Sequence, residues 1–306
     1  MPSPDNPAPK TNQDTPQGLA FAVTAYGLWG FLPIYMKWLA HVPPTEVVVH
    51  RILWSVPLAA LVLLILRRTD ALRQALRSPS MLGMGCVTAA LISINWGVYV
   101  WAIANDRALD AALGYYINPL FSIFLGAVLL GERPSRAQIV AIALAFGAVV
   151  VLAVDAGSLP WVALVLTVSW GFYALAKKSL PIGPNQGFLL EVLILTPPAL
   201  GYLVYLSLNG QSHFLQGPAI DTWLLMGCGV VTAVPLLIYA NGAKLLRLST
   251  IGILQYIAPT LIMLVAVFIF KEPFGQARMI AFPMIWAALV IYSASMLRQM
   301  RGAKVG

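Results

Sequence analysis

Residues 99–132 read Y-V-W-A-I-A-N-D-R-A-L-D-A-A-L-G-Y-Y-I-N-P-L-F-S-I-F-L-G-A-V-L-L-G-E, which is two apolar segments joined by a short polar turn. The chain repeats this pattern 140 residues later without a gap, and Y-I-N-P returns as Y-I-A-P. Identical residues align at that shift: Tyr99 with Tyr239, Arg107 with Arg247, Tyr116 with Tyr256, Pro119 with Pro259, and Glu132 with Glu272. The dipeptide W-G at Trp29 returns at Trp170. Self-similarity at a fixed spacing predicts an internal duplication.

The composition indicates a membrane protein. Of 306 residues, 59% are hydrophobic and only 10% are charged, and the mean hydropathy is +0.81. A soluble globular chain has about a quarter of its residues charged, whereas a helix that crosses a bilayer needs about 20 apolar residues. In a soluble protein the pI near 9.6 would suggest nucleic acid as a partner. Here we attribute it to Lys and Arg in cytoplasmic loops, and we expect a lipid bilayer and no nucleic acid as partners.

Apolar runs predict ten spans joined by short loops. Their expected ranges are 18–38, 47–66, 81–103, 109–130, 136–154, 160–177, 186–208, 222–243, 249–270 and 276–297. Residues 1–17 lack the apolar core of a signal peptide, so we expect a disordered cytoplasmic tail there and a second cytoplasmic tail at 298–306. Cys86 and Cys228 fall in apolar runs and are expected to be buried free thiols.

Charge in the loops predicts the orientation. With the N-terminus inside, fourteen Lys and Arg fall on the cytoplasmic side of the membrane and three on the opposite side, so both termini are expected in the cytoplasm. The expected location is the inner membrane of a bacterium. Five spans per half is an odd number, so the second half must be inverted. The predicted fold is an all-α polytopic membrane protein of two inverted five-helix repeats, residues 18–154 and 160–297. Inverted repeats are typical of secondary transporters that expose a site near mid-membrane alternately.

Arg51 is the most informative polar residue, because an ionisable side chain inside a membrane is costly and usually functional. It lies about one turn into the second span, after Glu46 and His50. One interpretation is a fixed positive charge that faces an anionic or carboxylate-bearing solute, a role that suits guanidinium. The alternative is an arginine that reaches toward the outer interface and pairs with Glu46.

Other polar residues are weaker evidence for a solute-binding site. Lys37 ends the first span and is a candidate ligand group, or else an interfacial lysine. Glu191 opens the seventh span, where it either titrates or complements the helix dipole. Asn95 and Tyr99 are four residues apart and share a helix face. Tyr and Trp near helix ends are also typical of the interfacial belt. Pro119 and Pro259 each free a carbonyl one turn earlier and are candidate hinges.

Several strings carry a resemblance to a known family. Ten spans in two inverted halves, W-G in the first span of each half and G-E-R-P after the fourth span resemble the drug/metabolite transporter superfamily, EamA type. A-Y-G-L-W-G-F-L-P-I-Y-M-K-W-L, E-V-V-V-H-R-I-L-W-S and N-W-G-V-Y-V-W-A-I-A-N are similar to RarD proteins, which are associated with chloramphenicol sensitivity. The resemblance implies a plasma-membrane carrier whose central cavity is lined by spans one, three, four, six, eight and nine. The lining residues it implies are Trp29, Asn95, Trp96, Tyr99, Tyr115, Asn118, Tyr239 and Gln255.

The leading hypothesis is a carrier that moves a small organic solute by alternating access, with export as the direction by family analogy. Protons are a candidate coupling ion, and the expected state is a monomer or homodimer. No cofactor or metal is expected. An intramembrane enzyme is disfavoured because H-E-x-x-H, G-x-S-x-G and paired intramembrane aspartates are missing from the sequence. A passive channel and a membrane scaffold stay as alternatives.

Overall fold

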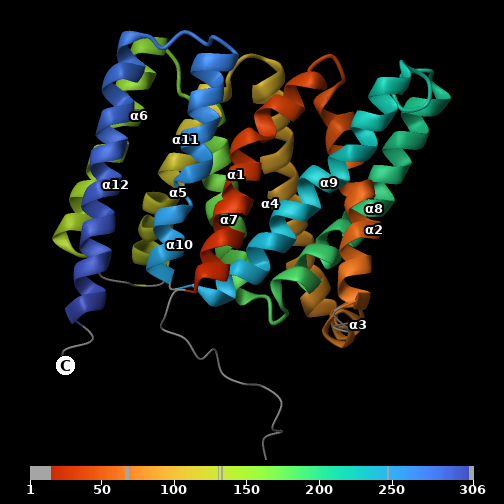
Figure 1. Ribbon diagram of the computed structural model, residues 1–306, viewed down its shortest axis with the longest axis horizontal. Helices are drawn as coiled ribbons and strands as arrows, with labels where there is room; N and C mark the ends of the chain where they lie inside the picture. Colours follow the sequence, from red (N-terminus) through yellow and green to blue (C-terminus); the bar gives the residue numbers. More distant parts are fainter. Residues whose placement is uncertain (1–14, 66–68, 130, 132–133, 247, 303–306) are drawn as a thin grey trace, which may run out of the picture.

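The computed structural model describes residues 15–65, 69–129, 131, 134–246 and 248–302. Within this part the chain is all helical, and nine segments are long and apolar enough to cross a membrane. A tenth apolar helix, α7, is shorter (Figure 1). The segments are α1 (Pro16–Trp38), α2 (Pro44–Ile65), α4 (Pro79–Ala104), α5 (Ala108–Leu129), α6 (Arg136–Ala156), α7 (Trp161–Ser179), α8 (Pro184–Leu208), α9 (Ala219–Gly242), Thr250–Ile269 and α12 (Gln276–Gly302).

Local signals explain where the helices begin and end. Proline occupies the first turn of α1, α4 and α8, where its missing N–H costs nothing. Ser135 and Gln138 form a reciprocal capping box at the start of α6. Gly157 ends α6 with a φ of 62°, a conformation that glycine adopts without strain. These stops leave only short connections, so consecutive spans alternate in direction.

Large apolar side chains cover the outside of the bundle. Val154, Leu208 and Phe146 have 77%, 82% and 70% of their surface exposed. An exposed apolar belt of this kind is unfavourable in water and suits hydrocarbon. The chain is therefore built to lie in a lipid bilayer.

The two cysteines differ in their surroundings. Cys228 is buried as expected, but Cys86 is exposed, so the expectation of a buried thiol was wrong at that position.

The two halves of the chain interlock. The helix α2 packs against α8 and α9, α1 packs against α9 and α11 (Ile257–Leu264), and α4 and α5 both pack against α7. Gly229 in α9 meets the backbone of Trp54 so closely that a β-carbon there would collide with it. Small residues allow such close contacts between membrane helices. Any site in the middle of the bundle is therefore formed by helices of both halves.

The structure corrects three expectations. The ninth span is not one α-helix, because α10 (Leu248–Leu254) stops before Gln255, α11 follows, and η2 (Val265–Ile269) is a π-helix. Its counterpart α5 is continuous although both contain a proline. Pro259 lies in the first turn of α11, where proline is tolerated, whereas Pro119 lies in the interior of α5.

The second correction concerns the 67–80 loop, part of which forms α3 (Asp70–Arg77), whose apolar side is buried. Third, α1 and α12 extend into the predicted tails, and residues 1–14 and 303–306 lie outside the described part.

Candidate functional site

Arg51 is buried in the middle of the bundle. It lies about two turns into α2, and 3% of its surface is exposed. Its Nε donates a hydrogen bond to Oγ1 of Thr232 in α9 over 3.0 Å. Its guanidinium carbon lies 4.7 Å from the ring centre of Trp96 in α4, a cation–π distance. Three helices from both halves of the chain therefore hold one positive charge.

Within the described part of the chain, no carboxylate neutralises this charge. Arg51 forms no ion pair with any Asp or Glu in the described residues, and its buried Nη1 has no hydrogen-bond partner there. Glu46, the alternative partner, is directed to Ser212 and His213 instead. The alternative in which Arg51 pairs with Glu46 at the interface was therefore wrong. An uncompensated buried charge lowers the stability of a fold by several kcal/mol, so Arg51 destabilises the ligand-free protein.

Polar groups of α4 and α5 lie beside Arg51. Asn95 donates through Nδ2 to the carbonyl oxygen of Leu166 (3.1 Å) and to Oγ of Ser169 (3.0 Å), both in α7. The hydroxyl of Tyr115 donates to Oδ1 of Asn95 over 3.1 Å. The rings of Tyr99 and Tyr115 have centroids 5.9 Å apart. This network holds Tyr115 against Asn95, whose neighbour in the chain, Trp96, lies under the guanidinium of Arg51.

Three buried polar atoms of this region have no hydrogen-bond partner in the described residues. They are Nη1 of Arg51, the hydroxyl of Tyr99 and Oδ1 of Asn118. Asn118 lies one turn after Tyr115 on the same face of α5. Buried polar groups are almost always paired, and each exception needs an explanation such as a missing ligand. We refer to Arg51, Asn95, Trp96, Tyr99, Tyr115 and Asn118 together as the Arg51 cluster.

The other predicted site residues have different surroundings. Trp29 and Tyr239 pack with Tyr26 in a separate aromatic group, with ring centroids 5.5–5.6 Å apart. The Nζ of Lys37 lies 2.6 Å from the Asp106 carboxylate and donates to the carbonyl of Ile103. Gln255 bonds the carbonyl of Gly252, one turn earlier in its own segment. Within the cluster, direct contacts join Tyr115 to Tyr99 and Asn95, and Arg51 to Trp96, while Asn118 is included because it lies one turn after Tyr115 on α5. Trp29, Lys37, Tyr239 and Gln255 lie outside the cluster.

Glu191 was misplaced in the sequence analysis. It lies two turns into α8, not in its first turn, and 1% of its surface is exposed. Its Oε1 is 2.6 Å from Nζ of Lys177, and its Oε2 accepts from the hydroxyl of Tyr173 over 3.2 Å. The start of α8 lies 140 residues after the start of α2, which aligns Glu191 with Arg51, but the W-G dipeptides of the preceding span are 141 residues apart and align Lys37 with Lys178, so the repeat contains no direct signal for this ion pair.

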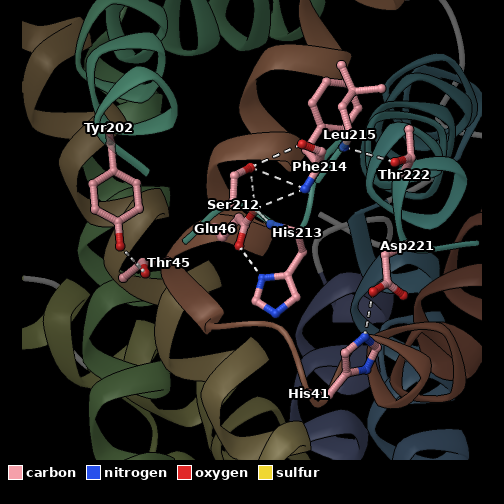
Figure 2. Close-up of polar contacts among 10 residues, drawn as sticks. All are labelled: His41, Thr45, Glu46, Tyr202, Ser212, His213, Phe214, Leu215, Asp221 and Thr222. Carbon is pink, nitrogen blue, oxygen red and sulfur yellow. Dashed lines mark hydrogen bonds and ion pairs between the residues drawn. The ribbon is translucent and has the colours of Figure 1, made fainter. Parts of the chain in front are cut away.

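A second set of polar contacts ties the two halves together at the end of the bundle where α1 ends and α2 begins, here called the far end. Figure 2 shows that the Glu46 carboxylate accepts hydrogen bonds from Oγ of Ser212 and from the backbone N–H of His213 (2.7 Å). The carboxylate also lies 2.8 Å from Nδ1 of His213. Beside it, Nε2 of His41 is 3.0 Å from the Asp221 carboxylate. We call these five residues the far-end contacts. They hold the 209–218 segment against α2.

Glu272 makes a similar contact at the far end. It precedes α12, and its carboxylate accepts from the backbone N–H groups of Ala108 (2.6 Å) and Leu109 (3.0 Å), which are free donors at the start of α5. Burial raises the pKa of Glu272, and the two backbone donors oppose that shift. Glu272 thus joins the second half to the first by capping a helix.

An apolar pocket of about 570 Å³ lies on the side of the bundle, between α2, α4, α7 and α8. Val48, Ile52, Trp101 and Leu195 are among its lining residues, and no member of the Arg51 cluster lines it. A wall of this composition offers few polar contacts for fixing a solute. The described residues also contain no group of three or more His, Cys, Asp or Glu that could hold a metal ion. The Arg51 cluster is therefore the better candidate for the functional site.

Fold and site together define a polytopic all-α membrane protein with a polar site inside its bundle. The model of the EamA-like transporter family matches residues 16–154. Protein RarD of Streptomyces exfoliatus is 41% identical over 96% of this chain and 94% of its own length, and Protein RarD of Escherichia coli (strain K12) is 40% identical over 92% and 95%. The uncharacterized transporter YojE of Bacillus subtilis (strain 168) is 40% identical over 95% and 98%.

The chain belongs to the EamA-like transporter family, as a RarD-like member, and it is a multi-pass membrane transporter. A solved crystal structure of another protein superposes with a TM-score of 0.58 over 92% of this chain and 98% of the other, at 20% identity. That likeness concerns the fold alone.

Proposed function

We propose that this protein is a secondary carrier that moves a small organic solute by alternating access through the middle of the bundle. The observation that carries the proposal is the buried, unpaired Arg51, which α2, α4 and α9 hold between the two halves of the chain. A buried, uncompensated charge destabilises the ligand-free protein, and such a charge is retained where binding of a ligand offsets that loss of stability. A scaffold has no need of it, and a channel is separated from a carrier by the flux experiment below.

The duplication supports alternating access. We propose that residues 18–154 and 160–297 act as two inverted repeats that rock about the Arg51 cluster. The far-end contacts join residues of the first repeat, such as Glu46, to residues of the second, such as His213. Such contacts would have to break when the far end opens, and Pro119 and Pro259 remain candidate hinges for that movement. Two packings of interlocked helices that differ in these contacts would provide the two states.

The remaining assignments follow the charge distribution and the family. We place the protein in the bacterial inner membrane with both termini in the cytoplasm, which puts the far end on the outside. We assign export as the direction by analogy, protons as the candidate coupling ion, and a monomer or homodimer as the assembly. The bundle needs no cofactor for this work, and we assign it no enzymatic activity.

Counterflow in sealed proteoliposomes tests the proposal. Vesicles are loaded with a panel of amino acids, organic acids and neutral aromatic compounds, and uptake of the labelled member of each class is followed. A carrier gives saturable uptake that depends on unlabelled solute of the same class inside. Flux that does not saturate and needs no internal solute would contradict the carrier and favour a channel. Absence of flux from folded, correctly inserted protein, also with a cell extract as the internal solute, would favour a scaffold.

A further inference from the structure

We infer that the Arg51 cluster binds a small monocarboxylate whose carboxylate lies beside a flat apolar group. This inference rests on the proposed function insofar as it names the transported class, while binding to the cluster can be tested without transport. Four features carry it: the sign of the charge, its magnitude, the unpaired donors and the rings around them.

The charge determines the sign and valence of the ligand. The cluster contains one guanidinium, and the nearby carboxylates of α2 and α8 are occupied: Glu46 bonds Ser212 and His213, and Glu191 pairs with Lys177. The protein therefore offers Arg51 no counterion from these positions. A monoanion would neutralise the site, whereas a dianion would leave one negative charge buried. Burying a net charge is costly in either direction.

The free donors determine the anionic group. Nε of Arg51 is engaged by Thr232, which fixes the side chain, while Nη1 is buried without a partner. The Tyr99 hydroxyl is a second buried donor that has no partner among the described residues, and the Tyr99 ring packs against that of Tyr115, with centroids 5.9 Å apart. A carboxylate has two oxygens that accept from two such donors, and hydrogen bonds to a charged acceptor are the strong ones. Recognition of a carboxylate is a role for which guanidinium is better suited than ammonium.

The rings determine the rest of the ligand. Arg51 lies over Trp96, and the Tyr99 and Tyr115 rings are 5.9 Å apart at angles that are neither parallel nor perpendicular. Tyr115 in turn meets Trp170 edge-on at 6.5 Å. Aromatic side chains pack favourably against flat apolar groups, in offset or edge-to-face arrangements. The aromatic walls and the arginine therefore belong to one site, and they favour one ligand that has both an apolar plane and a negative charge.

Calorimetric titration of the purified protein in detergent tests the inference with benzoate and benzamide, which have nearly the same shape but differ in charge. We expect benzoate to bind at least about tenfold more tightly than benzamide, because a charge-assisted pair contributes more than a neutral hydrogen bond. Phthalate, a dianion, should bind more weakly than benzoate. Equal binding of benzoate and benzamide, or no saturable binding of benzoate up to millimolar concentration, would overturn the inference.

Variants locate the binding. Arg51→Gln should remove the preference for benzoate over benzamide, and Arg51→Lys should retain part of it because the charge stays but the two-donor geometry is lost. Arg73→Gln is the control, because Arg73 is an exposed arginine of α3 away from the cluster. A preference that survives in folded Arg51→Gln protein would overturn the assignment. If that variant does not fold, the benzoate, benzamide and phthalate comparison on the unmodified protein still decides.

Counterflow separates this inference from the proposed function. Saturable counterflow of neutral solutes, with no preference for monocarboxylates, would overturn the substrate class and leave the carrier intact. Arg51-dependent binding of benzoate without counterflow of any solute would uphold the binding site and overturn the carrier.

Discussion

Arg51 in α2 and Glu191 in α8 occupy equivalent positions, 140 residues apart and each about two turns into its helix. Glu191 is neutralised by Lys177, at a distance of 2.6 Å, and this ion pair links α8 to α7. Arg51 has the opposite charge at the equivalent position of the first half. The lysine that ends the first span, Lys37, lies 2.6 Å from the Asp106 carboxylate. Among the residues that the structure describes, the first half therefore has a cation without a carboxylate partner where the second half has an ion pair.

This difference suggests how a duplicated scaffold acquires a binding site. In α8 the ion pair is complete within the protein and contributes to structure. In α2 no carboxylate of the described residues pairs with Arg51, and under the proposed function an anionic solute supplies the missing charge. The asymmetry extends to neighbouring residues: Asn95 aligns with Pro235 and Asn118 with Ala258, so the polar groups of the cluster come from the first half.

Removing one partner of the ion pair should have the largest effect on stability. Glu191→Gln leaves Lys177 buried without its counterion and should lower the free energy of unfolding by about 3–5 kcal/mol. Arg51→Gln removes a charge that is already unpaired and should leave stability unchanged or raise it. Thermal unfolding in detergent, followed by tryptophan fluorescence, measures both. If the two variants lost equal stability, Arg51 would be as well compensated as Glu191, and the contrast between the two positions would be wrong.

The prolines sharpen the comparison between the two halves. Pro119 lies inside the continuous helix α5, and Pro259 lies in the first turn of α11. Pro119→Ala should stabilise the protein by up to about 3 kcal/mol, because an interior proline lacks a helix hydrogen bond, whereas Pro259→Ala should change stability by less than about 1 kcal/mol. Thermal unfolding measures this, and counterflow rates report whether either proline is a hinge. Equal stabilisation by both changes would show that the break before α11 does not accommodate Pro259.

The far-end contacts should have a smaller effect. Glu46→Gln keeps the shape of the side chain but removes the charge that accepts from His213 and Ser212, and it should lower stability by about 2 kcal/mol. Thr45→Val is the matched control, because Thr45 lies beside Glu46 in the first turn of α2 and the change removes only an exposed hydrogen bond to Tyr202 of α8. Both variants are compared by thermal unfolding. A loss from Glu46→Gln no larger than that from Thr45→Val would contradict a closing role for Glu46.

Much of the fold was predictable from the sequence. Ten apolar runs and a gapless repeat determine the number and order of spans, because length and hydropathy are properties of each segment alone. The break at Gln255 was not predictable in this way, since Pro119 and Pro259 occupy matching positions and only one follows an interruption. The outcome depends on how each helix packs, and that information is not local.

The site was predictable in part. The cost of charge in a membrane singled out Arg51, which the structure places in the buried middle of the bundle, but its neighbour was misjudged, because Glu46 is turned toward the 209–218 segment. Thr232, the actual partner, is 181 residues away and no periodicity points to it. The ion pair of Lys177 and Glu191 was not predictable either, because the two residues lie on different helices and only the folded bundle brings them together.

The most direct measurement is counterflow of benzoate and benzamide by the unmodified protein and by Arg51→Gln, in vesicles with equal amounts of folded protein. The account predicts saturable counterflow of benzoate, at least about tenfold faster than that of benzamide at low concentration, and loss of this preference in the variant. Counterflow of both compounds at equal rates, unchanged by Arg51→Gln, would contradict the claim that the unpaired arginine is the solute site.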